Sequence, residues 1–425
     1  MTIIVAGGGI AGLTMALTCH EIGLDVKVFE AAKTIKPLGV GINLQPNAVR
    51  ELYQLGLEQD LRELGIEAEE WALFFYDAHP IWTETRGTVA GYKWPQFSVH
   101  RGQFHNRLLQ QVRKRLGQDA FVNDARFTHY QNTPTGVSAS FVRSNGDTLV
   151  VEGDVLIGAD GIHSGVRKQM YPNQGEVHWN GAIMWRGVSR VAPPRKRSSF
   201  VFVGGITQRF ICYPVTPIDN NGETMLNWIA ELRTSDLEQA DRSDWNQRAS
   251  KDAFLGEFLD WDFGWLNVPQ IVNRSSEIWE YPMVDRDPVD HWVDGRTALI
   301  GDAAHAMCPQ GSGGASQAIV DTRVLGASLL KLGVNESALL DYEAKLLKPV
   351  NELVMRNRAE GPTGVLIDIE DKLAKGDSID AAIDKDAVAD FMARYKAAAG
   401  TAMVDLNAAP PTITIQDGNR GARTL

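Results

Sequence analysis

The hydrophobic pattern of the first thirty residues predicts a strand, a helix and a second strand. Residues 2–6 form a short apolar run rich in β-branched side chains, which is typical of a buried parallel strand. Leu13, Ala16 and Leu17 then recur at helical spacing, and residues 25–29 form a second short apolar run. We therefore expect the chain to open with a βαβ unit of a parallel sheet.

The turn between the first strand and the helix has the glycine spacing of a dinucleotide-binding loop. Gly7 permits a tight turn, Gly9 lets the backbone approach a pyrophosphate, and Gly12 allows the helix to pack closely on the strand. Glu30 follows the second strand, where an acidic side chain can hydrogen-bond a ribose hydroxyl. Because all these parts occur in register, we favour a nucleotide cofactor over a plain glycine turn.

Two later segments repeat the pattern of a buried strand, a glycine-containing loop and a helix. In residues 154–167 the strand ends at Asp160, which either serves a cofactor or simply caps the following helix. In residues 298–319 the strand is followed by Asp302 and then by a loop rich in proline and glycine. A carboxylate there can bind sugar hydroxyls, and the free N–H groups of a helix N-terminus can bind an anion or an electron-rich ring.

The middle of the chain predicts a second sheet. Residues 178–282 are rich in aromatic and β-branched runs, and residues 71–94 carry tryptophan, threonine and tyrosine in a strand-like pattern. Residues 121–160 predict an antiparallel meander with a turn at Asn145 and Gly146. From Gln317 onward the pattern is helical.

Composition and charge narrow the class of protein. A chain of 425 residues favours two intertwined domains over one small core. The net charge of −11, without a basic block, argues against a nucleic-acid partner. None of the three cysteines lies in a CxxC motif, which argues against a disulfide framework or a zinc site. No apolar run approaches membrane-spanning length and no charged leader precedes the first strand, so we expect a cytoplasmic protein without a membrane partner.

Together the three glycine segments, in this order and spacing, resemble group A flavin-dependent aromatic hydroxylases, the para-hydroxybenzoate and salicylate hydroxylase family. The resemblance covers about residues 1–360, and runs at residues 37–46, 184–188 and 281–288 are closest in pattern to phenazine-1-carboxylate-type monooxygenases. It implies an α/β fold with a Rossmann-like FAD-binding domain, an inserted mixed β-sheet substrate domain and C-terminal helices.

The domains implied by this resemblance are discontinuous in sequence. The expected boundaries are 1–70, 99–177 and 283–347 for the FAD-binding domain, 71–98 and 178–282 for the substrate-binding domain, 348–403 for the C-terminal helices, and 404–425 for an extended tail.

The resemblance also implies an activity. Side chains alone do not activate dioxygen, so a bound FAD carries the difficult step. NADH or NADPH reduces the FAD, dioxygen adds at flavin C4a, and the resulting C4a-hydroperoxyflavin hydroxylates a planar, carboxylate-bearing aromatic substrate. The sequence contains no second GxGxxG unit, so NADH or NADPH is expected to bind transiently. Epoxidation, decarboxylative hydroxylation and a non-catalytic flavin-binding or electron-transfer role are the alternatives, and no interface signature sets the oligomeric state.

The resemblance assigns cofactor roles to residues of all three loops. Pro309 and Gly311 are expected to position the flavin and the peroxide, with no side-chain base and no metal. The expected cofactor-binding residues are Gly7, Gly9 and Gly12 at the pyrophosphate, Glu30 at the adenosine ribose, Arg101 at the phosphates, Asp160 at the pyrophosphates of both cofactors, Asp302 at the ribityl chain, and Gly313, Gly314 and Ala315 at the ring.

The substrate pocket is expected on the strands of the second sheet. Strand alternation places Arg209, Ile211 and Tyr213 on one face, and an arginine with aromatic neighbours suits a planar aromatic carboxylate. Arg186 is a fourth expected substrate-binding residue.

Residues near these motifs with aromatic, sulfur-containing or imidazole side chains have expected roles as well. Trp185 and Trp228 are further pocket candidates, whereas Met184 is expected in the core. His305 and Cys308 are the most reactive-looking residues of the third loop, and we expect both to be structural.

Overall fold

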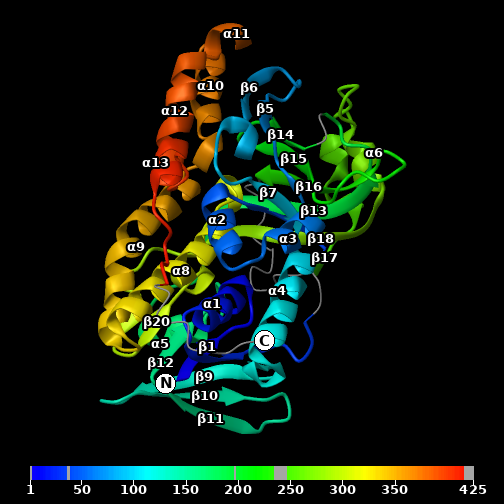
Figure 1. Cartoon of the computed structure of the whole chain (residues 1–425). Coiled ribbons are helices and arrows are strands. Elements are labelled where there is room, and N and C mark those ends of the chain that lie inside the picture. The colour runs from blue at the N-terminus through cyan, green and yellow to red at the C-terminus, as the bar shows by residue number, and fades with distance from the viewer. Residues whose placement is uncertain (1, 36–38, 196–197, 234–246, 416–425) are drawn as a thin grey trace.

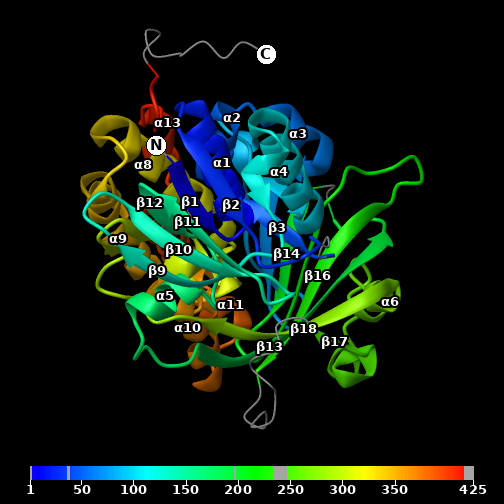
Figure 2. The same cartoon turned by 90° about the horizontal axis from the view of Figure 1, so that it is seen from below.

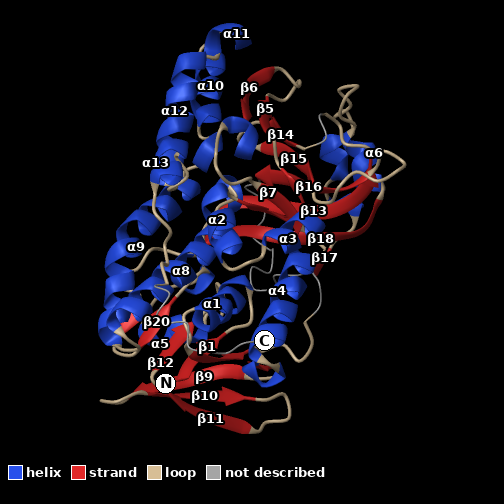
Figure 3. Cartoon of the chain, in the orientation of Figure 1, coloured by secondary structure: helices blue, strands red, loops and turns tan. Residues whose placement is uncertain are grey.

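The computed structural model describes residues 2–35, 39–195, 198–233 and 247–415 (Figure 1). Two large sheets lie beside each other, and a column of helices that includes α9, α12 and α10 runs along one side of the molecule (Figure 3). The expected α/β fold, with an inserted mixed sheet and C-terminal helices, is confirmed.

The first sheet has six strands in the described part of the chain. β1 pairs in parallel with both β2 and β12, and β12 pairs in parallel with β20. In spatial order the strands are β19 (Val293–Asp294), β20 (Thr297–Leu299), β12 (Val155–Gly158), β1 (Thr2–Ala6), β2 (Asp25–Phe29) and β8 (Phe121–Val122). The carboxyl ends of β1, β12 and β20 therefore meet at one edge, which brings the three glycine loops together.

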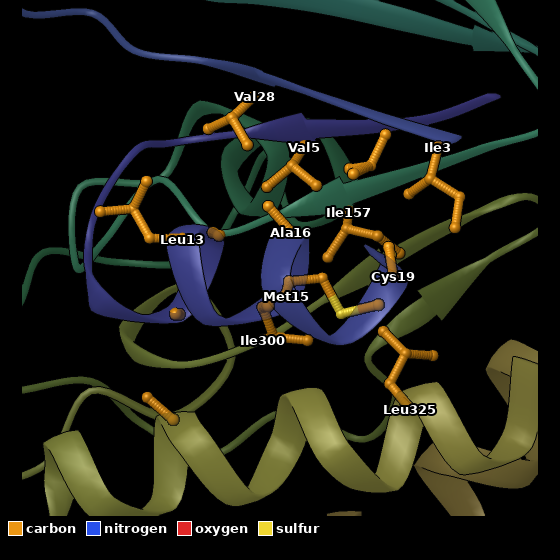
Figure 4. Packing of buried hydrophobic residues seen from close by; sticks show 14 of the residues in the cluster. Ile3, Val5, Leu13, Met15, Ala16, Cys19, Val28, Ile157, Ile300 and Leu325 are labelled. Atoms are coloured by element: carbon orange, nitrogen blue, oxygen red, sulfur yellow. The ribbon is translucent and has the colours of Figure 1, made fainter. Parts of the chain in front are cut away.

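Helix α1 (Ile10–Glu21) is buried between this sheet and α8 (Gly314–Leu332). Figure 4 shows Ala16 of α1 against Val5 of the sheet, with Met15 on the side of Ile300. The small side chain of Ala16 allows this close approach, and the apolar contacts on both sides of the helix explain why α1 has no polar face.

Smaller elements surround the first sheet. The predicted meander is confirmed, because β9 (Arg126–Asn132), β10 (Val137–Val142) and β11 (Thr148–Gly153) pair antiparallel. A separate small sheet of three strands contains β3 (Gly41–Leu44), β7 (Phe97–His100) and β4 (Gly65–Glu67). The helices of this region are α2 (Pro46–Gln54), α3 (Glu58–Leu64), α4 (Arg101–Leu116), α5 (Gly165–Met170) and α7 (Asp302–His305).

The second sheet has eight strands in the described residues and is mixed, because β14 pairs in parallel with β5 while the other pairs are antiparallel. Figure 2 shows β13, β16 and β18 of this sheet to one side of the first sheet. In spatial order the strands are β17 (Gln247–Arg248), β18 (Ser275–Asp285), β13 (His178–Val191), β16 (Thr224–Arg233), β15 (Gln208–Pro214), β14 (Ser199–Gly204), β5 (Glu70–Phe74) and β6 (Pro80–Thr85).

The two faces of this second sheet differ. One face packs on α6 (Val268–Asn273) and an aromatic cluster that includes Phe254, Phe258 and Trp261. The other face is turned toward the carboxyl edge of the first sheet and lines a cavity between them. Each strand therefore contributes alternate residues to a core and to a cavity wall.

The C-terminal helices cover the edge of both sheets. They are α9 (Glu336–Arg358), α10 (Val365–Ala374), α11 (Ile379–Ala382), α12 (Lys385–Ala398) and α13 (Met403–Ala408). Leu366, Ile369 and Met392 from these helices pack with Trp71 and Phe200 of the second sheet. Single turns of 3-10 helix occupy Gly87–Ala90, Gln118–Ala120, Lys251–Ala253, Leu255–Phe258, Pro309–Gly311 and Gly361–Thr363.

The expectation of an extended tail over 404–425 is wrong for its first residues. They belong to α13, which docks on the loop after Gly87–Ala90: the Asn407 amide donates to Gly91 O at 2.9 Å and accepts from Lys93 N at 2.9 Å. Residues 416–425 of the predicted tail lie outside the described residues.

Candidate active site

The glycine loop after β1 packs directly against the loop after β12. Gly7 has a φ of +108°, and a Cβ there would overlap the carbonyl group of Ala159. A Cβ on Gly12 would overlap the carbonyl oxygen of Gly7, so the turn and the first turn of α1 are in contact. In contrast, a Cβ on Gly9 would meet no atom of the described residues within 4 Å. The backbone at Gly9 is therefore open at the N-terminus of α1, as a pyrophosphate site requires.

A cavity of about 360 Å³ lies between the three loops and the second sheet. Backbone of the loops forms one wall, and alternate residues of β13, β14, β15 and β16 form the other. The lining includes these expected site residues: Gly9, Arg101, Arg186, Arg209, Ile211, Tyr213, Asp302, Pro309, Gly313, Gly314 and Ala315. The structure thus brings together residues from segments far apart in the sequence.

Arg101 begins α4, and its guanidinium lines this cavity beside Asp302. Burial lowers the pKa of Arg101, and the Asp302 carboxylate opposes that shift. Among the described residues, none accepts a hydrogen bond from this guanidinium, so its donors are available to an anionic ligand. Asp302 begins α7 at the same wall, where its carboxylate can accept from hydroxyl groups.

The loop from Pro309 to Ala315 leads into α8 without a side-chain cap. Ser312 adopts a left-handed conformation with a φ of +49°, which turns the chain into the helix. The first N–H groups of α8, including those of Gly314 and Ala315, therefore lie uncapped at the cavity wall. Gly311 lies on the other side of this loop, against Tyr395 and Asn357.

Glu30 and Asp160 are both held by backbone N–H groups. Oε2 of Glu30 accepts from Gly8 N at 2.7 Å, which fixes the carboxylate beside the first turn. Oδ2 of Asp160 accepts from Gly165 N at 2.8 Å, and its other oxygen accepts from the Ser164 hydroxyl. The carboxylate of Asp160 thus caps α5, and the cavity is lined by its neighbours rather than by Asp160 itself.

Arg186 and Tyr213 lie on the cavity face of the second sheet. The Arg186 guanidinium donates to Gly41 O at 2.8 Å and lies 5.9 Å from the centre of the Tyr281 ring, while its Nε has no hydrogen-bond partner among the described residues. Tyr213 stacks on Phe200 with ring centres 4.6 Å apart. Burial raises the pKa of Tyr213, and Arg186 opposes that shift. The predicted alternation of Arg209, Ile211 and Tyr213 toward one face is confirmed, because all three line the cavity.

Arg209 is already paired within the protein. Its side chain is 0% exposed, it donates to Gly205 O at 2.7 Å, and it forms an ion pair with Glu360 at the end of α9. Glu231 lies across from it on β16, with 3.5 Å between Arg209 Nη1 and Glu231 Oε1. The positive charge of Arg209 is therefore balanced internally, unlike that of Arg186.

Two expectations on the second sheet are wrong. Trp185 stacks on Phe254 at 4.9 Å and donates to Glu280, and Trp228 donates to Ser275 at 2.7 Å; both lie on the aromatic face, away from the cavity. Met184 belongs to a buried apolar cluster with Ala182, Met283 and Cys308, as expected for a core residue, and it also lines the cavity. Period-two alternation separates the two faces of β13 and β16 in the sequence. Which face meets the cofactor depends on how the two sheets pack.

His305 and Cys308 have structural contacts. His305 Nε2 lies 2.6 Å from Oδ2 of Asp321, a carboxylate that also accepts from Gly301 N at 2.8 Å. The Cys308 thiol donates to Asp285, which Arg358 also binds at 2.6 Å. Neither side chain lines the cavity.

Further residues line the cavity, and their local sequence marks them only weakly. Glu231 occurs two positions after Ile229, and period-two spacing places both on the cavity face. Asn43 and Gln310 also line the cavity, but nothing in their local sequence distinguishes them from other polar loop residues. Thr363, a further lining residue, lies on the 3-10 turn after α9.

The chemistry of the lining fits FAD. Open backbone at Gly9, the unpaired guanidinium of Arg101, the Asp302 carboxylate and the uncapped start of α8 match a pyrophosphate, a ribityl chain and an electron-rich ring. Within the described ranges, no group of three or more His, Cys, Asp or Glu side chains could hold a metal ion. None of the described helices combines the length and the apolar character needed to cross a bilayer.

Comparisons with known proteins agree with this chemistry. The family model described as FAD binding domain matches residues 1–357. The chain is 39% identical over 361 residues to a phenazine 1,6-dicarboxylic acid hydroxylase of Lysobacter antibioticus, covering 84% of this chain and 89% of that protein. It is 29% identical over 405 residues to the salicylate hydroxylase of Pseudomonas putida, covering 89% of this chain and 88% of the relative.

Solved structures show the same fold. Klebsiella pneumoniae HpxO in complex with FAD and uric acid superposes with a TM-score of 0.75 at 22% identity, over 95% of this chain and 96% of that one. A salicylate hydroxylase substrate complex gives a TM-score of 0.69 at 21% identity, over 95% and 98% of the two chains. With residues 1–357 matched, the chain belongs to the FAD binding domain family, and it is an FAD-dependent aromatic hydroxylase that uses NAD(P)H and dioxygen.

Proposed function

We propose that the substrate is a planar aromatic carboxylate and that Arg186 binds its carboxylate group. The observation that carries this proposal is the difference between Arg186 and Arg209, the two arginines that line the cavity from the second sheet. Glu360 and Glu231 balance the charge of Arg209, whereas no described carboxylate forms an ion pair with Arg186. An arginine with a free donor beside aromatic rings suits an aromatic acid, because the guanidinium can bind a carboxylate while apolar walls hold the ring.

The remainder of the cavity wall supports a flat, apolar substrate. Ile211, Ile229, Phe200 and Phe202 line the cavity from the same face of the second sheet as the charged residues. The relatives named after phenazine 1,6-dicarboxylic acid and salicylate act on aromatic carboxylates, which agrees with this proposal.

We further propose how the residues of this chain hold the cofactor. Gly9 and Arg101 bind the phosphates of FAD, Glu30 binds the adenosine ribose, Asp302 binds the ribityl chain, and the start of α8 lies at the ring. Bound FAD supplies the redox chemistry with dioxygen that side chains lack. Pro309 and the second sheet exclude water from the space between the ring and the substrate.

The test is substrate-stimulated oxidation of NADH and of NADPH by the FAD-loaded protein. Phenazine-1-carboxylate, salicylate, quinolone carboxylates and indole carboxylates form the panel, and incorporation of ¹⁸O from labelled dioxygen identifies the hydroxylated product. Comparison of the two nicotinamide nucleotides also decides which is the better reductant. If no aromatic acid stimulates oxidation or yields labelled product, the proposal is wrong.

Arg186→Met isolates the proposed carboxylate anchor. We expect KM for the acid to rise about tenfold or more, because the variant loses a charged hydrogen bond, while FAD content stays constant. Arg190→Met is the matched control, since Arg190 lies on the same strand but is exposed and pairs with Asp219. Equal KM values for the Arg186 variant and the wild type would exclude Arg186 as the anchor.

A further inference from the structure

The peptide group between Gly8 and Gly9 lies at the start of α1, where the proposed cofactor site needs a free N–H. The N–H of Gly9 donates to none of the described residues, and a Cβ on Gly9 would meet none of their atoms within 4 Å. Gly9 is the N-cap of α1 and has no side chain that could bond the helix N-terminus. The direction of this N–H therefore depends on how the plane of the Gly8–Gly9 peptide is held.

A histidine side chain binds the carbonyl group of this peptide. The Nε2–H of His105 donates to Gly8 O, with 2.6 Å between the two heavy atoms. A carbonyl oxygen only accepts, so Nε2 carries the proton. The N–H of a trans peptide points in the direction opposite to its C=O, and no described peptide bond is cis. By binding Gly8 O, His105 therefore fixes the direction of the Gly9 N–H, and Gly9 itself lines the cavity.

The peptide group before Gly8 is held as well. Oε2 of Glu30 accepts from Gly8 N at 2.7 Å, and Oε1 of the same carboxylate accepts from Ala32 N at 2.8 Å. A Cβ on Gly8 would lie 2.7 Å from the ring of Phe121 and 3.0 Å from Cβ of Glu30, so Gly8 is closely enclosed. With Glu30 on its N–H and His105 on its C=O, both peptide planes at Gly8 are fixed by side chains of other elements.

His105 lies four residues after Arg101 on α4, so the two side chains project from the same face of the helix. Arg101 lines the cavity, whereas His105 does not. Burial and the charge of Arg101 lower the pKa of His105 below its ordinary value, against the opposing effects of Gly8 O and Glu30. His105 is therefore neutral at pH 7, and it contributes a hydrogen bond to the turn rather than a charge to the cavity.

We propose that His105 is a positioning residue for the pyrophosphate of FAD. It acts through Gly8 O and holds the Gly9 N–H in place as a donor for a phosphate oxygen, while Arg101 supplies the positive charge. Without His105 the peptide plane must be ordered when FAD binds, and that ordering weakens the affinity. This inference rests on the proposed function, because it assumes that the pyrophosphate binds at Gly9 and Arg101.

The test measures FAD affinity and folding separately, starting from protein freed of FAD. His105→Leu removes the donor, so we expect the Kd for FAD to rise about tenfold or more. His105→Gln keeps an N–H donor at the end of the side chain, and we expect its Kd to lie within about threefold of the wild-type value. Equilibrium dialysis gives Kd, and calorimetry of the FAD-free proteins shows that each variant is folded.

Gln111→Leu is the matched control, because Gln111 also lies on α4 and donates to Oδ2 of Asp60 at 2.8 Å, outside the glycine turn. It should leave the Kd for FAD unchanged. The ratio of the Kd of His105→Gln to that of the wild type should be the same at about pH 6 and at about pH 8, because the hydrogen bond to Gly8 O needs no charge on the ring.

Arg101→Met and Gly9→Ala separate this inference from the proposed cofactor site. If they weaken FAD binding while His105→Leu does not, or does so no more than Gln111→Leu, the inference about His105 is wrong and the phosphate site stands. Failure of His105→Gln to restore affinity, or a wild-type advantage confined to the lower pH, would also overturn it, because His105 would then act by its charge. If none of these variants weakens FAD binding, the proposed cofactor site fails and this inference fails with it.

Discussion

The hydroxyl group of Tyr395 donates to Oδ1 of Asn357 at 2.8 Å, and Gly311 lies directly against both side chains. Tyr395 comes from α12, which lies beyond residues 1–357 that match the family model. Burial raises the pKa of this tyrosine well above its ordinary value, so its hydroxyl keeps its proton and stays a donor. The C-terminal helices therefore fix the loop from Pro309 to Ala315 on the side that faces away from the cavity.

Gly311→Ala should displace this loop. Its Cβ would overlap the Tyr395 hydroxyl and lie 2.7 Å from Asn357 Oδ1, and neither side chain can withdraw without breaking their hydrogen bond. We expect the variant to retain about a tenth or less of the wild-type kcat and to melt at a lower temperature. Gly256→Ala is the control, since a Cβ there meets nothing within 4 Å and Gly256 lies outside the cavity. Wild-type kcat in the Gly311 variant would show that the loop does not depend on this contact.

Gly9→Ala and Gly12→Ala separate cofactor binding from folding. A Cβ at Gly12 would overlap Gly7 O, so this variant should lower the melting temperature of the protein even without FAD. A Cβ at Gly9 meets no protein atom, so the FAD-free variant should melt as the wild type does while FAD affinity falls about tenfold or more. Equilibrium dialysis and calorimetry give the two quantities, and unchanged FAD affinity in the Gly9 variant would exclude the pyrophosphate from this turn.

Arg209→Met should destabilise the fold by about 3–5 kcal/mol, because it leaves the buried carboxylates of Glu360 and Glu231 without their shared cation. Arg233→Met is the matched comparison, since Arg233 binds the same Glu360 but its side chain is 31% exposed, and its removal should cost about 1 kcal/mol. Urea unfolding measures both free energies. A smaller loss for Arg209 than for Arg233 would contradict the structural role assigned to this ion pair.

His305 predicts a pH dependence of stability. Burial alone would lower the pKa of His305, but the carboxylates of Asp321 and Asp302 raise it more, so the pKa in the folded protein lies above its ordinary value of 6.5. Such a histidine stabilises the fold fully below pH 6.5, and the stabilisation is lost as the pH rises through the folded-state pKa.

The free energy of unfolding of the wild type minus that of His305→Gln should therefore decrease as the pH rises above 6.5. Urea unfolding across this pH range provides the measurement. A constant difference for His305→Gln would show that the ring does not titrate differently on folding.

Local sequence signals predicted the parts of the fold that depend on neighbouring residues. The turn at Gly7 and Gly12, the parallel strands that precede the three loops, and the meander around Gly146 all follow from patterns within a few residues. The start of the predicted tail is instead the helix α13, which local patterns did not predict. This helix is stabilised by contacts with Gly91 and Lys93 on a loop far away in the sequence.

On the second sheet, only those features of the site that follow from strand alternation could be predicted from the sequence. Period-two spacing placed Arg209, Ile211 and Tyr213 on one face, and the cavity confirms that placement. The partner of Arg209 is Glu360, from a helix end far along the chain, and no spacing in the sequence relates the two. Trp185 was assigned to the wrong face for the same reason, since alternation separates two faces but does not say which one meets the cofactor.

The opposite faces of the second sheet have a consequence for how this protein can change over time. Met184, Arg186, Ile229 and Glu231 contact the cavity, while the residues between them, such as Trp185, contact the aromatic core. Glu231 is excepted because it pairs with Arg209. Substitutions at Met184, Arg186 and Ile229 can alter which molecules are accepted without disturbing the aromatic core on the opposite face. New substrate preferences can therefore be selected, in nature or in the laboratory, at these three positions with little disturbance of that core.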